Sequence, residues 1–429
     1  MKLKHFLLND ENIEKSSYIW NMAGSMLMAF QSVIMLMILT RTVGLAEAGV
    51  FTIAYANASL FLNIGKYGMR NFQVSDVYGQ FSFIEYLRSR WMTTLLMIIV
   101  SIAYIVHSSL VNNYSFEKSM VIIWMCLFKI ADAIEDVYYG MYQQKGRLDI
   151  AAKAMTLRMF FTIIIFGIGI IVLHNQLISL IIATMTTFGL LGLFLSWTYG
   201  TFNIKKGHCR KGQVTRLLKS CFPLFAGAFL SFYIGNAPKY AIDALLSDEL
   251  QACYGFIAMP VFVIGLLNSF IFNPILFQMS CLWNEGKVKR FIKRTIVQIG
   301  VVVGITIICI IGAYFLGTPV LSVLYNTNLA PYKKELLLLL AGGGFLGLTG
   351  LLSTVITIIR FQKGIAWGYA VVAVLAYIFS NPVVSKYGIM GAVVLYVVLM
   401  VILCLCFAGL FISGIYIQSK KRKSNWSII

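Results

Sequence analysis

The chain has 429 residues, of which 59% are apolar and only 12% are charged. Soluble domains carry about 25% charged residues, so this composition argues against a water-soluble fold. The formal net charge of +19 would suit a nucleic-acid-binding protein only if the basic residues clustered on a polar folded domain, and the apolar stretches leave no room for one. We therefore expect no nucleic-acid partner.

Twelve apolar stretches are long enough to cross a membrane as helices, since about 20 mainly apolar residues span a hydrocarbon core of about 30 Å. The first six are Ser17–Leu39, Ala46–Gly65, Trp91–Val111, Ser119–Tyr142, Leu157–Leu173 and Leu177–Trp197. The second six are Cys221–Leu246, Leu250–Phe277, Ile292–Leu316, Leu336–Ile359, Ile365–Ser380 and Ile389–Ile417. The runs are continuous rather than alternating, so they predict an all-α integral membrane protein with twelve transmembrane helices.

The basic residues are distributed unevenly between the predicted loops. With the N-terminus inside, cytoplasmic segments, counted together with the first three residues of the helices that follow them, hold 28 of the 35 Lys and Arg. The external loops hold five, namely Arg41, Lys118, Lys333, Lys334 and Lys386. The positive-inside rule therefore predicts that both termini are cytoplasmic. The cytoplasmic cations also attract the anionic lipids of the inner leaflet, so membrane lipids are expected partners.

The fourth predicted helix, WMCLFKIADAIEDVYYG, carries charges inside the membrane. Lys129, Asp132 and Asp136 share one face, and Glu135 points about a quarter-turn away. A charge at the membrane centre costs about 2.5 to 3.5 kcal/mol, so it usually faces a partner or a cavity. In one interpretation Lys129 only pairs with Asp132. In the other, Lys129 attracts a phosphate group in a cavity, and the carboxylates titrate or bind a coupling cation, H⁺ or Na⁺.

A charged segment, residues 199–220, divides the predicted helices six and six, which suggests lobes at 1–205 and 206–429 related as a parallel repeat. AGVFTIA and ACYGFIA are the best trace of that repeat. All seven prolines lie in the second half, four of them in helices seven and eight. We expect Pro238 and Pro260 to bend these two helices, because each removes a backbone hydrogen bond.

The seventh helix, SFYIGNAPKYAIDALL, places a second lysine inside the membrane. Lys239 could simply pair with Asp243, four residues later. Alternatively, Asn236, Lys239 and Tyr240 line a cleft between the lobes and meet a sugar or phosphate, with Asp243 joining the ion-coupling carboxylates. Four further basic candidates lie at helix ends, where snorkelling to the interface is the default: Arg41, Lys66, Arg70 and Arg360.

Motifs for catalysis and for cofactors are missing. Gly65-Lys66 and Gly286-Lys287 lack the Ser or Thr of a phosphate-binding loop, and there is no D-x-D or H-E-x-x-H motif. The run from Gly342 to Gly347 matches G-x-G-x-x-G but lies in a predicted membrane helix, where close helix packing explains it better. The eight cysteines and four histidines show no metal-ligand spacing. The sequence thus predicts a protein that is not an enzyme and has no bound cofactor.

Several segments together resemble one transporter family. They are ILTRTVGLAEAGVFTIAYA, IGKYGMRNFQVSD, NAPKYAIDALLSDELQACYGFIAMPVFVI and PILFQMSCLWNEG. In this order they resemble the polysaccharide-transport, Wzx-like branch of the multidrug/oligosaccharidyl-lipid/polysaccharide (MOP) exporter superfamily. The resemblance implies two six-helix lobes, alternating access, and a location in the bacterial cytoplasmic membrane. Lipid II flippases of this superfamily look richer in arginine within helices one and two.

The function implied by the resemblance is a flippase that moves a polyprenyl-diphosphate-linked oligosaccharide from the inner to the outer leaflet. Cationic cavity residues would meet the diphosphate, which fits Lys129 and Lys239. Polysaccharide assembly machinery is then a further expected partner. A cation-coupled multidrug exporter of the same fold is the first alternative, motivated by the carboxylates of helix four. A membrane glycan polymerase or ligase is the second, and the short external loops count against it.

Overall fold

The computed structural model describes residues 2–9, 11–76, 79–202, 210, 212–359, 361 and 363–426. Helices make up almost all of this part, and it contains no strand. Ten of its helices are long and apolar enough to cross a membrane. The prediction of an all-α, multi-pass membrane protein is therefore confirmed.

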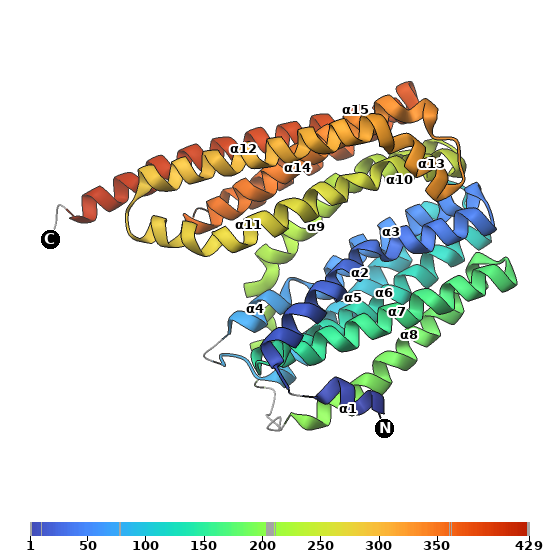
Figure 1. Cartoon of the computed structure of the whole chain (residues 1–429), viewed down its shortest axis with the longest axis horizontal. Coiled ribbons are helices and arrows are strands. Elements are labelled where there is room, and N and C mark those ends of the chain that lie inside the picture. The colour runs from blue at the N-terminus through green and yellow to red at the C-terminus, as the bar shows by residue number, and fades with distance from the viewer. Residues whose placement is uncertain are drawn as a thin grey trace. The chain divides into compact units, whose positions relative to one another are not determined.

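The chain separates into two compact units, residues 1–229 and 230–429. Unit 1 contains α1 to α8 and the first part of α9, and Figure 1 shows its long helices running side by side. The bounds are α1 Lys2–Leu8, α2 Ile13–Thr42, α3 Leu45–Lys66, α4 Met69–Ser75, α5 Phe83–Val111, α6 Phe116–Gln144, α7 Leu148–Leu173, α8 Gln176–Thr198 and α9 Gln213–Leu245. The predicted lobe boundary between residues 205 and 206 lies outside the described residues and stays a prediction.

Unit 2 contains the rest of α9 and the helices that follow it. Their bounds are α10 Asp248–Ala258, α11 Pro260–Asn284, α12 Val288–Gly312, α13 Thr318–Tyr325, α14 Lys333–Ile358 and α15 Lys363–Trp426. A short π-helix, Ala313–Gly317, joins α12 to α13. α10 ends at Ala258 and Pro260 begins α11, so the helix is interrupted where the sequence predicts a bend. Pro238 lies within α9, whose helical assignment continues through it.

α15 is a helical hairpin rather than one rod. Its backbone leaves the helical region at Gly388, where φ is 57° and ψ is −138°. Gly364 lies against Leu410 and Gly368 against Phe407, so the two limbs run antiparallel.

The predicted total of twelve membrane crossings requires that both limbs of α15 and also α6 cross the membrane. α6 is not among the ten apolar spans because it carries too many charged residues. That total stays a prediction.

Each unit has one central helix. In unit 1, α6 packs against α3, α5, α7 and α8, and most of its residues from Val121 to Tyr142 are buried. In unit 2, α14 packs against α10, α11, α12 and α15. The glycines of α14 lie where neighbouring helices approach closely: Gly342 against Tyr396, Gly343 against Val261 and Gly344 against Thr306. Close packing is thus the confirmed role of this glycine run.

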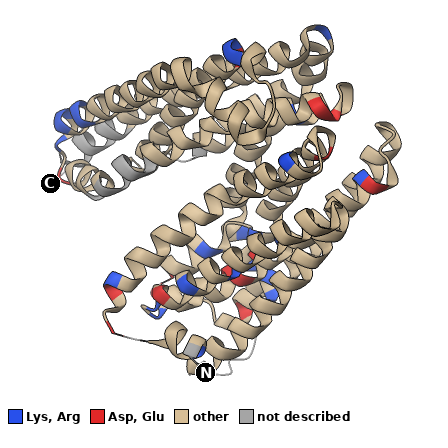
Figure 2. Ribbon diagram, turned by 45° about the vertical axis from the view of Figure 1, so that its right-hand side comes forward, with Lys and Arg blue, Asp and Glu red and all other residues tan. Residues whose placement is uncertain are grey.

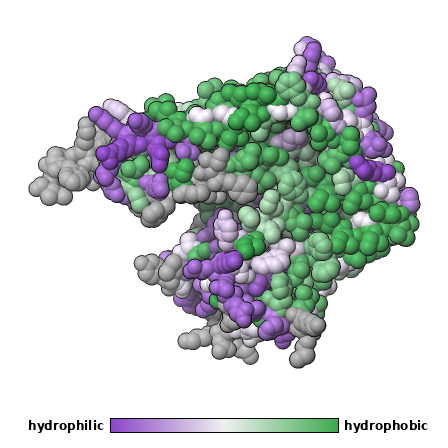
Figure 3. All heavy atoms as spheres, viewed as in Figure 1, coloured by the Kyte–Doolittle hydropathy of each residue, from purple (hydrophilic) through white to green (hydrophobic). Residues whose placement is uncertain are grey.

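Charge is arranged differently in the two units, whereas hydropathy follows the same pattern in both. In unit 1, charged positions lie in the interior of the helical bundle, whereas in unit 2 they lie mainly near the helix ends (Figure 2). In both units, hydrophobic residues cover the flanks of the helices and hydrophilic residues gather toward the ends (Figure 3). A hydrophobic flank of this kind is what the hydrocarbon region of a bilayer requires.

Candidate functional site

The candidate site is built on α6, the central helix of unit 1. Ser115 caps this helix by accepting a hydrogen bond from the Lys118 amide at 3.1 Å. From there the helix runs to Gln144 without a break, so the sequence spacing of its charged residues determines which face of the helix each one occupies. Lys129, Asp132 and Asp136 recur at intervals of three and four residues and share one face, as predicted.

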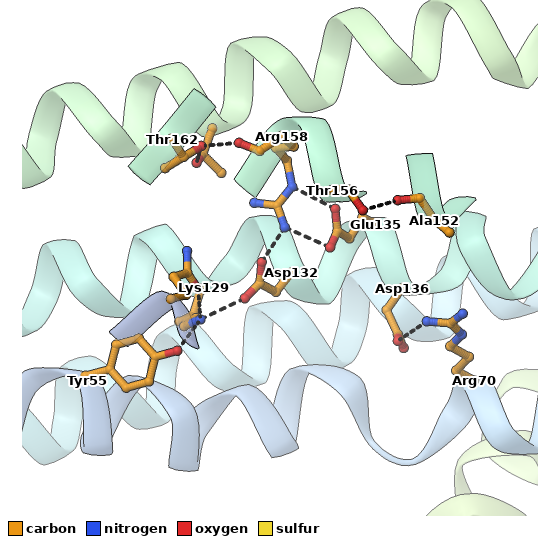
Figure 4. A network of polar contacts seen from close by, with 12 residues as sticks. Tyr55, Arg70, Lys129, Asp132, Glu135, Asp136, Ala152, Thr156, Arg158 and Thr162 are labelled. Atoms are coloured by element: carbon orange, nitrogen blue, oxygen red, sulfur yellow. Dashed lines mark hydrogen bonds and ion pairs between the residues drawn. The ribbon is translucent and has the colours of Figure 1, made fainter. Parts of the chain in front are cut away.

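Lys129 is almost fully buried, with 3% of its surface exposed, and is surrounded by acceptors. Its Nζ lies 3.0 Å from Asp132 Oδ2. It also donates to Gln31 Oε1 at 3.1 Å and to the Tyr55 hydroxyl at 3.2 Å (Figure 4). The ion pair that the simpler interpretation proposed is therefore present. The role of Lys129 in binding substrate stays a prediction, and the geometry favours a structural role.

Arg158, on α7, forms ion pairs with both Asp132 and Glu135 of α6. It is fully buried, and its Nη2 lies 2.6 Å from Asp132 Oδ1. Its Nε and Nη2 donate to the two oxygens of Glu135, each at 2.8 Å, which is the bidentate geometry that arginine forms with carboxylates (Figure 4). Asp132 therefore bridges Lys129 and Arg158, and neither acid of this cluster is left as an uncompensated charge.

Asp136 is held by two other arginines, Arg90 and Arg70. Arg90, on α5, is buried, and its Nη2 lies 2.6 Å from Asp136 Oδ2. Arg90 also donates through Nη1 to the carbonyl of Gly65. Arg70, on α4, approaches the other oxygen of Asp136 at 3.8 Å and donates to Gln143 Oε1 at 3.2 Å. Residues of α3, α4, α5 and α6 thus meet around the Asp136 carboxylate.

The turn between α3 and α4 brings two further cations to the site. α3 ends at Lys66, and both Tyr67 and Gly68 adopt left-handed backbone conformations, with φ of 51° and 63°. This turn lets α4 begin at Met69 and places Arg70 over α6. At Gly140 of α6 an added Cβ would clash with the side chain of Gln73 and would lie 3.4 Å from Arg70 Cγ.

Several of these groups line a partly open pocket in unit 1, which we call the α6 pocket. Its polar lining residues are Asn21, Ser25, Lys66, Arg70, Asp132, Glu135 and Asp136. Its other lining residues are Met28, Tyr139, Leu148, Ala151, Ala152 and Met155. Lys66 forms no hydrogen bond or ion pair with any residue that the structure describes.

The charges around the α6 pocket do not balance. Three carboxylates, Asp132, Glu135 and Asp136, meet five cations, namely Lys66, Arg70, Arg90, Lys129 and Arg158. The three buried cations, Lys129, Arg90 and Arg158, each have a carboxylate within 3.0 Å. The excess positive charge therefore resides on Lys66 and Arg70, both of which are only partly buried and face the pocket. An anionic group would complement this excess.

The structure brings together four of the predicted residues, Lys66, Arg70, Asp132 and Asp136, in the α6 pocket. Arg41 is exposed in the last turn of α2 and does not line the pocket. Arg360 lies outside the described residues.

The remaining candidates are on α9, in unit 2. Lys239 is partly buried and forms no ion pair or hydrogen bond with a described residue. Asn236 donates to the Phe232 carbonyl at 3.0 Å, and Tyr240 stacks on Tyr233 with ring centroids 6.0 Å apart. Asp243 is buried one turn after Lys239. Their roles in substrate binding and ion coupling stay predictions.

Sequence reasoning missed Arg90 and Arg158. Counting charges by loop assigned both to cytoplasmic segments, whereas the structure buries them as partners of Asp136, Asp132 and Glu135. One signal could have found them. Three carboxylates and one lysine on α6 require further cations, and both arginines lie at the start of a predicted helix, Arg90 one residue before Trp91 and Arg158 one residue after Leu157.

Comparison with solved structures identifies the fold. The lipid II flippase MurJ, in an inward closed conformation, is similar with a TM-score of 0.70 over 95% of this chain and 89% of that chain, at 15% identity. An inward-facing multidrug resistance MATE family transporter of the MOP superfamily is similar with a TM-score of 0.62 over 92% of this chain and 96% of that chain, at 13% identity. The chain has the MOP superfamily fold.

Comparison with curated sequences finds one similar bacterial protein. The capsular polysaccharide biosynthesis protein CapF of Staphylococcus aureus is 24% identical over 282 residues, which are 63% of this chain and 69% of that protein. No family model matches the sequence. The resemblance to the MOP superfamily is thus confirmed for the fold, and in this MOP fold the α6 pocket lies within a single unit.

Proposed function

We propose that the protein is a flippase for a polyprenyl-diphosphate-linked oligosaccharide, a precursor of a cell-surface polysaccharide, and that it acts in the bacterial cytoplasmic membrane. The observation that carries the proposal is the excess of positive charge on Lys66 and Arg70 in a pocket inside a membrane-spanning unit. Lys66 and Arg70 lie where α3 ends and α4 begins, and cations that face a pocket there can bind the anionic group of a lipid; a diphosphate is the anionic part of this substrate class.

Arg70 has the chemistry to bind a diphosphate. A guanidinium has five N–H donors, and in the described residues Arg70 uses one for Gln143 while remaining 3.8 Å from Asp136. Lys66 adds a compact charge with three donors. Met28, Leu148 and Met155 add apolar side chains to the lining of the same pocket, which suits the isoprenoid carbons next to the diphosphate.

The similarities support the same conclusion. MurJ, whose fold the chain shares, is a flippase for lipid II, and the relative from Staphylococcus aureus is a capsular polysaccharide biosynthesis protein. Polysaccharide assembly machinery would then act on the product at the outer leaflet. A coupling cation, H⁺ or Na⁺, would be exchanged at Asp132, Asp136 or Asp243.

Leaflet exchange in reconstituted vesicles tests this function. The full chain is inserted into unilamellar vesicles that contain a fluorescent polyprenyl-diphosphate oligosaccharide, and transfer between leaflets is followed with a quencher that cannot cross the membrane. We expect faster transfer than in empty vesicles and loss of most of this acceleration in the double variant Lys66→Gln/Arg70→Gln. The matched control, Lys333→Gln/Lys334→Gln, removes two cations at the start of α14 and should transfer normally.

A cation-coupled drug exporter is the second candidate function. It is favoured by the three carboxylates that line the α6 pocket and by the shared fold with MATE transporters. The same vesicles loaded with a cationic dye distinguish the two candidates. Dye export driven by a proton or sodium gradient, without any acceleration of lipid transfer, would refute the flippase and establish the exporter.

A further inference from the structure

A cluster of basic residues occupies the start of α12 in unit 2. Within the eight residues 287–294 there are five cations, all of them exposed: Lys287, Lys289, Arg290, Lys293 and Arg294. We call this group the α12 basic cluster. It lies at the beginning of a helix that is long and apolar enough to span the membrane.

The described part of the protein does not neutralise this cluster. Glu285 pairs with Lys287 at 2.6 Å, and Arg294 donates to Gln278 Oε1 at 3.4 Å. No ion pair or hydrogen bond links the side chains of Lys289, Arg290 or Lys293 to a described residue. The first turn of α12 contains no acidic residue, and its N-cap makes no side-chain hydrogen bond.

This arrangement is electrostatically unfavourable for an isolated helix. The N-terminal end of a helix carries partial positive charge, so cations there are repelled. Lys289 and Lys293 are also four residues apart, as are Arg290 and Arg294, and like charges at this spacing destabilise a helix. Negative charge from outside the described chain would therefore stabilise the start of α12.

The start of α5 in unit 1, by contrast, has an acidic residue and a side-chain cap. Its start has a full capping box, in which the Ser82 amide donates to Glu85 Oε2 at 2.8 Å and the Glu85 amide donates to Ser82 Oγ at 3.4 Å. Its exposed cation is Arg88, since Arg90 is buried against Asp136. A start without acids and with five exposed cations is thus a particular property of α12, beyond the general bias of basic residues toward one side of the membrane.

Lys289 and Lys293 lie on the side of α12 that faces away from the protein, and Arg290 and Arg294 flank its buried face. The buried face consists of Phe291, Thr295, Gln298, Val302 and Thr306. On the opposite face, Lys289 and Lys293 are followed at intervals of three and four residues by exposed positions 296, 300, 303 and 307. Of these, Ile296 is 62% exposed and Ile307 is 50% exposed. One continuous stripe therefore begins with cations and continues with hydrocarbon side chains.

The depth of the cations follows from helix geometry. At about 1.5 Å per residue, Lys293 lies about 4.5 Å along the axis from Ile296, the first apolar residue of the exposed stripe. Long Lys and Arg side chains next to a hydrocarbon boundary extend into the headgroup layer. Figure 3 shows hydrophobic residues along the flank of unit 2 and hydrophilic residues gathered at its ends, as this depth requires.

We propose that the α12 basic cluster is a docking surface for the phosphate headgroups of anionic phospholipids. Acyl chains would pack on Ile296, Val303 and Ile307 while the phosphates contact Lys289, Arg290, Lys293 and Arg294. The continuous stripe selects a lipid over an acidic protein, because a lipid supplies the phosphate and the hydrocarbon at the spacing that the stripe provides. The bound phosphates offset the repulsion among the cations and stabilise the first turns of α12.

Native mass spectrometry of the full chain tests the proposal. The purified protein in detergent is mixed with equal amounts of phosphatidylglycerol and phosphatidylcholine, and bound lipids are counted. We expect a preference for phosphatidylglycerol that falls by about fivefold or more in Lys289→Gln/Arg290→Gln/Lys293→Gln/Arg294→Gln, because each cation near a membrane surface adds to the attraction. The preference should also weaken in 1 M salt.

Two controls keep the result interpretable. Lys118→Gln/Lys333→Gln/Lys334→Gln/Lys386→Gln removes the same number of cations from scattered positions and should keep the preference. Lys289→Arg/Lys293→Arg preserves charge at the cluster and should also keep it, which separates charge from misfolding. An unchanged preference in the neutralised cluster variant, or an equal loss in the scattered variant, would overturn the proposal.

Discussion

The central helices of the two units are stabilised by opposite means. α6 carries Lys129, Asp132, Glu135 and Asp136 in its buried middle, and arginines from neighbouring helices compensate its acids. α14 has no charged residue after Glu335 and packs through a run of glycines. Unit 1 should therefore be sensitive to loss of charge at its centre, whereas unit 2 should be sensitive to added side-chain volume.

Removing Arg158 should have the largest effect on stability. Arg158→Met leaves Glu135 without its bidentate partner and leaves Asp132 with Lys129 alone, so we expect a loss of about 3 to 5 kcal/mol in the free energy of unfolding. Denaturant-induced unfolding in detergent, followed by circular dichroism, measures it. Arg88→Met, which removes an exposed arginine of α5, is the matched control and should change stability by about 0.5 kcal/mol or less.

A compensating variant sharpens this test. Glu135→Gln added to Arg158→Met removes the carboxylate that has lost its only ion-pair partner, whereas Asp132 keeps Lys129, so the double variant should recover part of the lost stability. A double variant less stable than Arg158→Met alone would show that packing of Arg158, and not its charge, holds α6 in place.

Added volume at α14 should have the next largest effect. A Cβ at Gly344 would lie 2.5 Å from Thr306 Cγ2, so Gly344→Val should separate α14 from α12 and lower stability by about 1 to 3 kcal/mol. Thermal unfolding in detergent measures the loss. Gly350→Val is the control on the same helix, because a Cβ at Gly350 meets nothing within 4 Å. Equal effects at both glycines would contradict the packing role of Gly344.

Lys129 distinguishes the two interpretations of α6. Because Arg158 still compensates Asp132, Lys129→Met should cost about 1 to 3 kcal/mol, mainly from the unpaired acceptors of Asp132 and Gln31, while lipid transfer is largely retained. Unfolding and vesicle transfer are measured on the same preparation. A variant of normal stability that has lost transfer would instead show that Lys129 contacts the substrate.

The sequence predicted what lies along one helix better than what lies between helices. Helical spacing gave the shared face of Lys129, Asp132 and Asp136, and proline chemistry gave the break before Pro260. Arg158 escaped prediction because its partners are 23 and 26 residues away, on another helix. Periodicity reports which face a side chain is on, and only packing decides which helix that face meets.

The location of the pocket shows the same limit. Lys66 and Arg70 looked like ordinary interfacial cations because they are close to a helix end. The left-handed turn at Tyr67 and Gly68 redirects the chain so that both face the α6 pocket. The glycine at position 68 suits such a turn, but the sequence does not reveal that α4 packs on α6.

The most direct test of the account is a binding measurement on the cations that face the α6 pocket. Purified full-length protein in detergent is titrated with geranylgeranyl diphosphate, and affinity is compared between the unchanged chain, Lys66→Gln/Arg70→Gln and the control Lys333→Gln/Lys334→Gln. We expect about a tenfold or greater loss of affinity in the pocket variant, equivalent to about 1.4 kcal/mol, with normal stability and a normal control. Equal affinity in all three proteins would contradict a diphosphate site at Lys66 and Arg70.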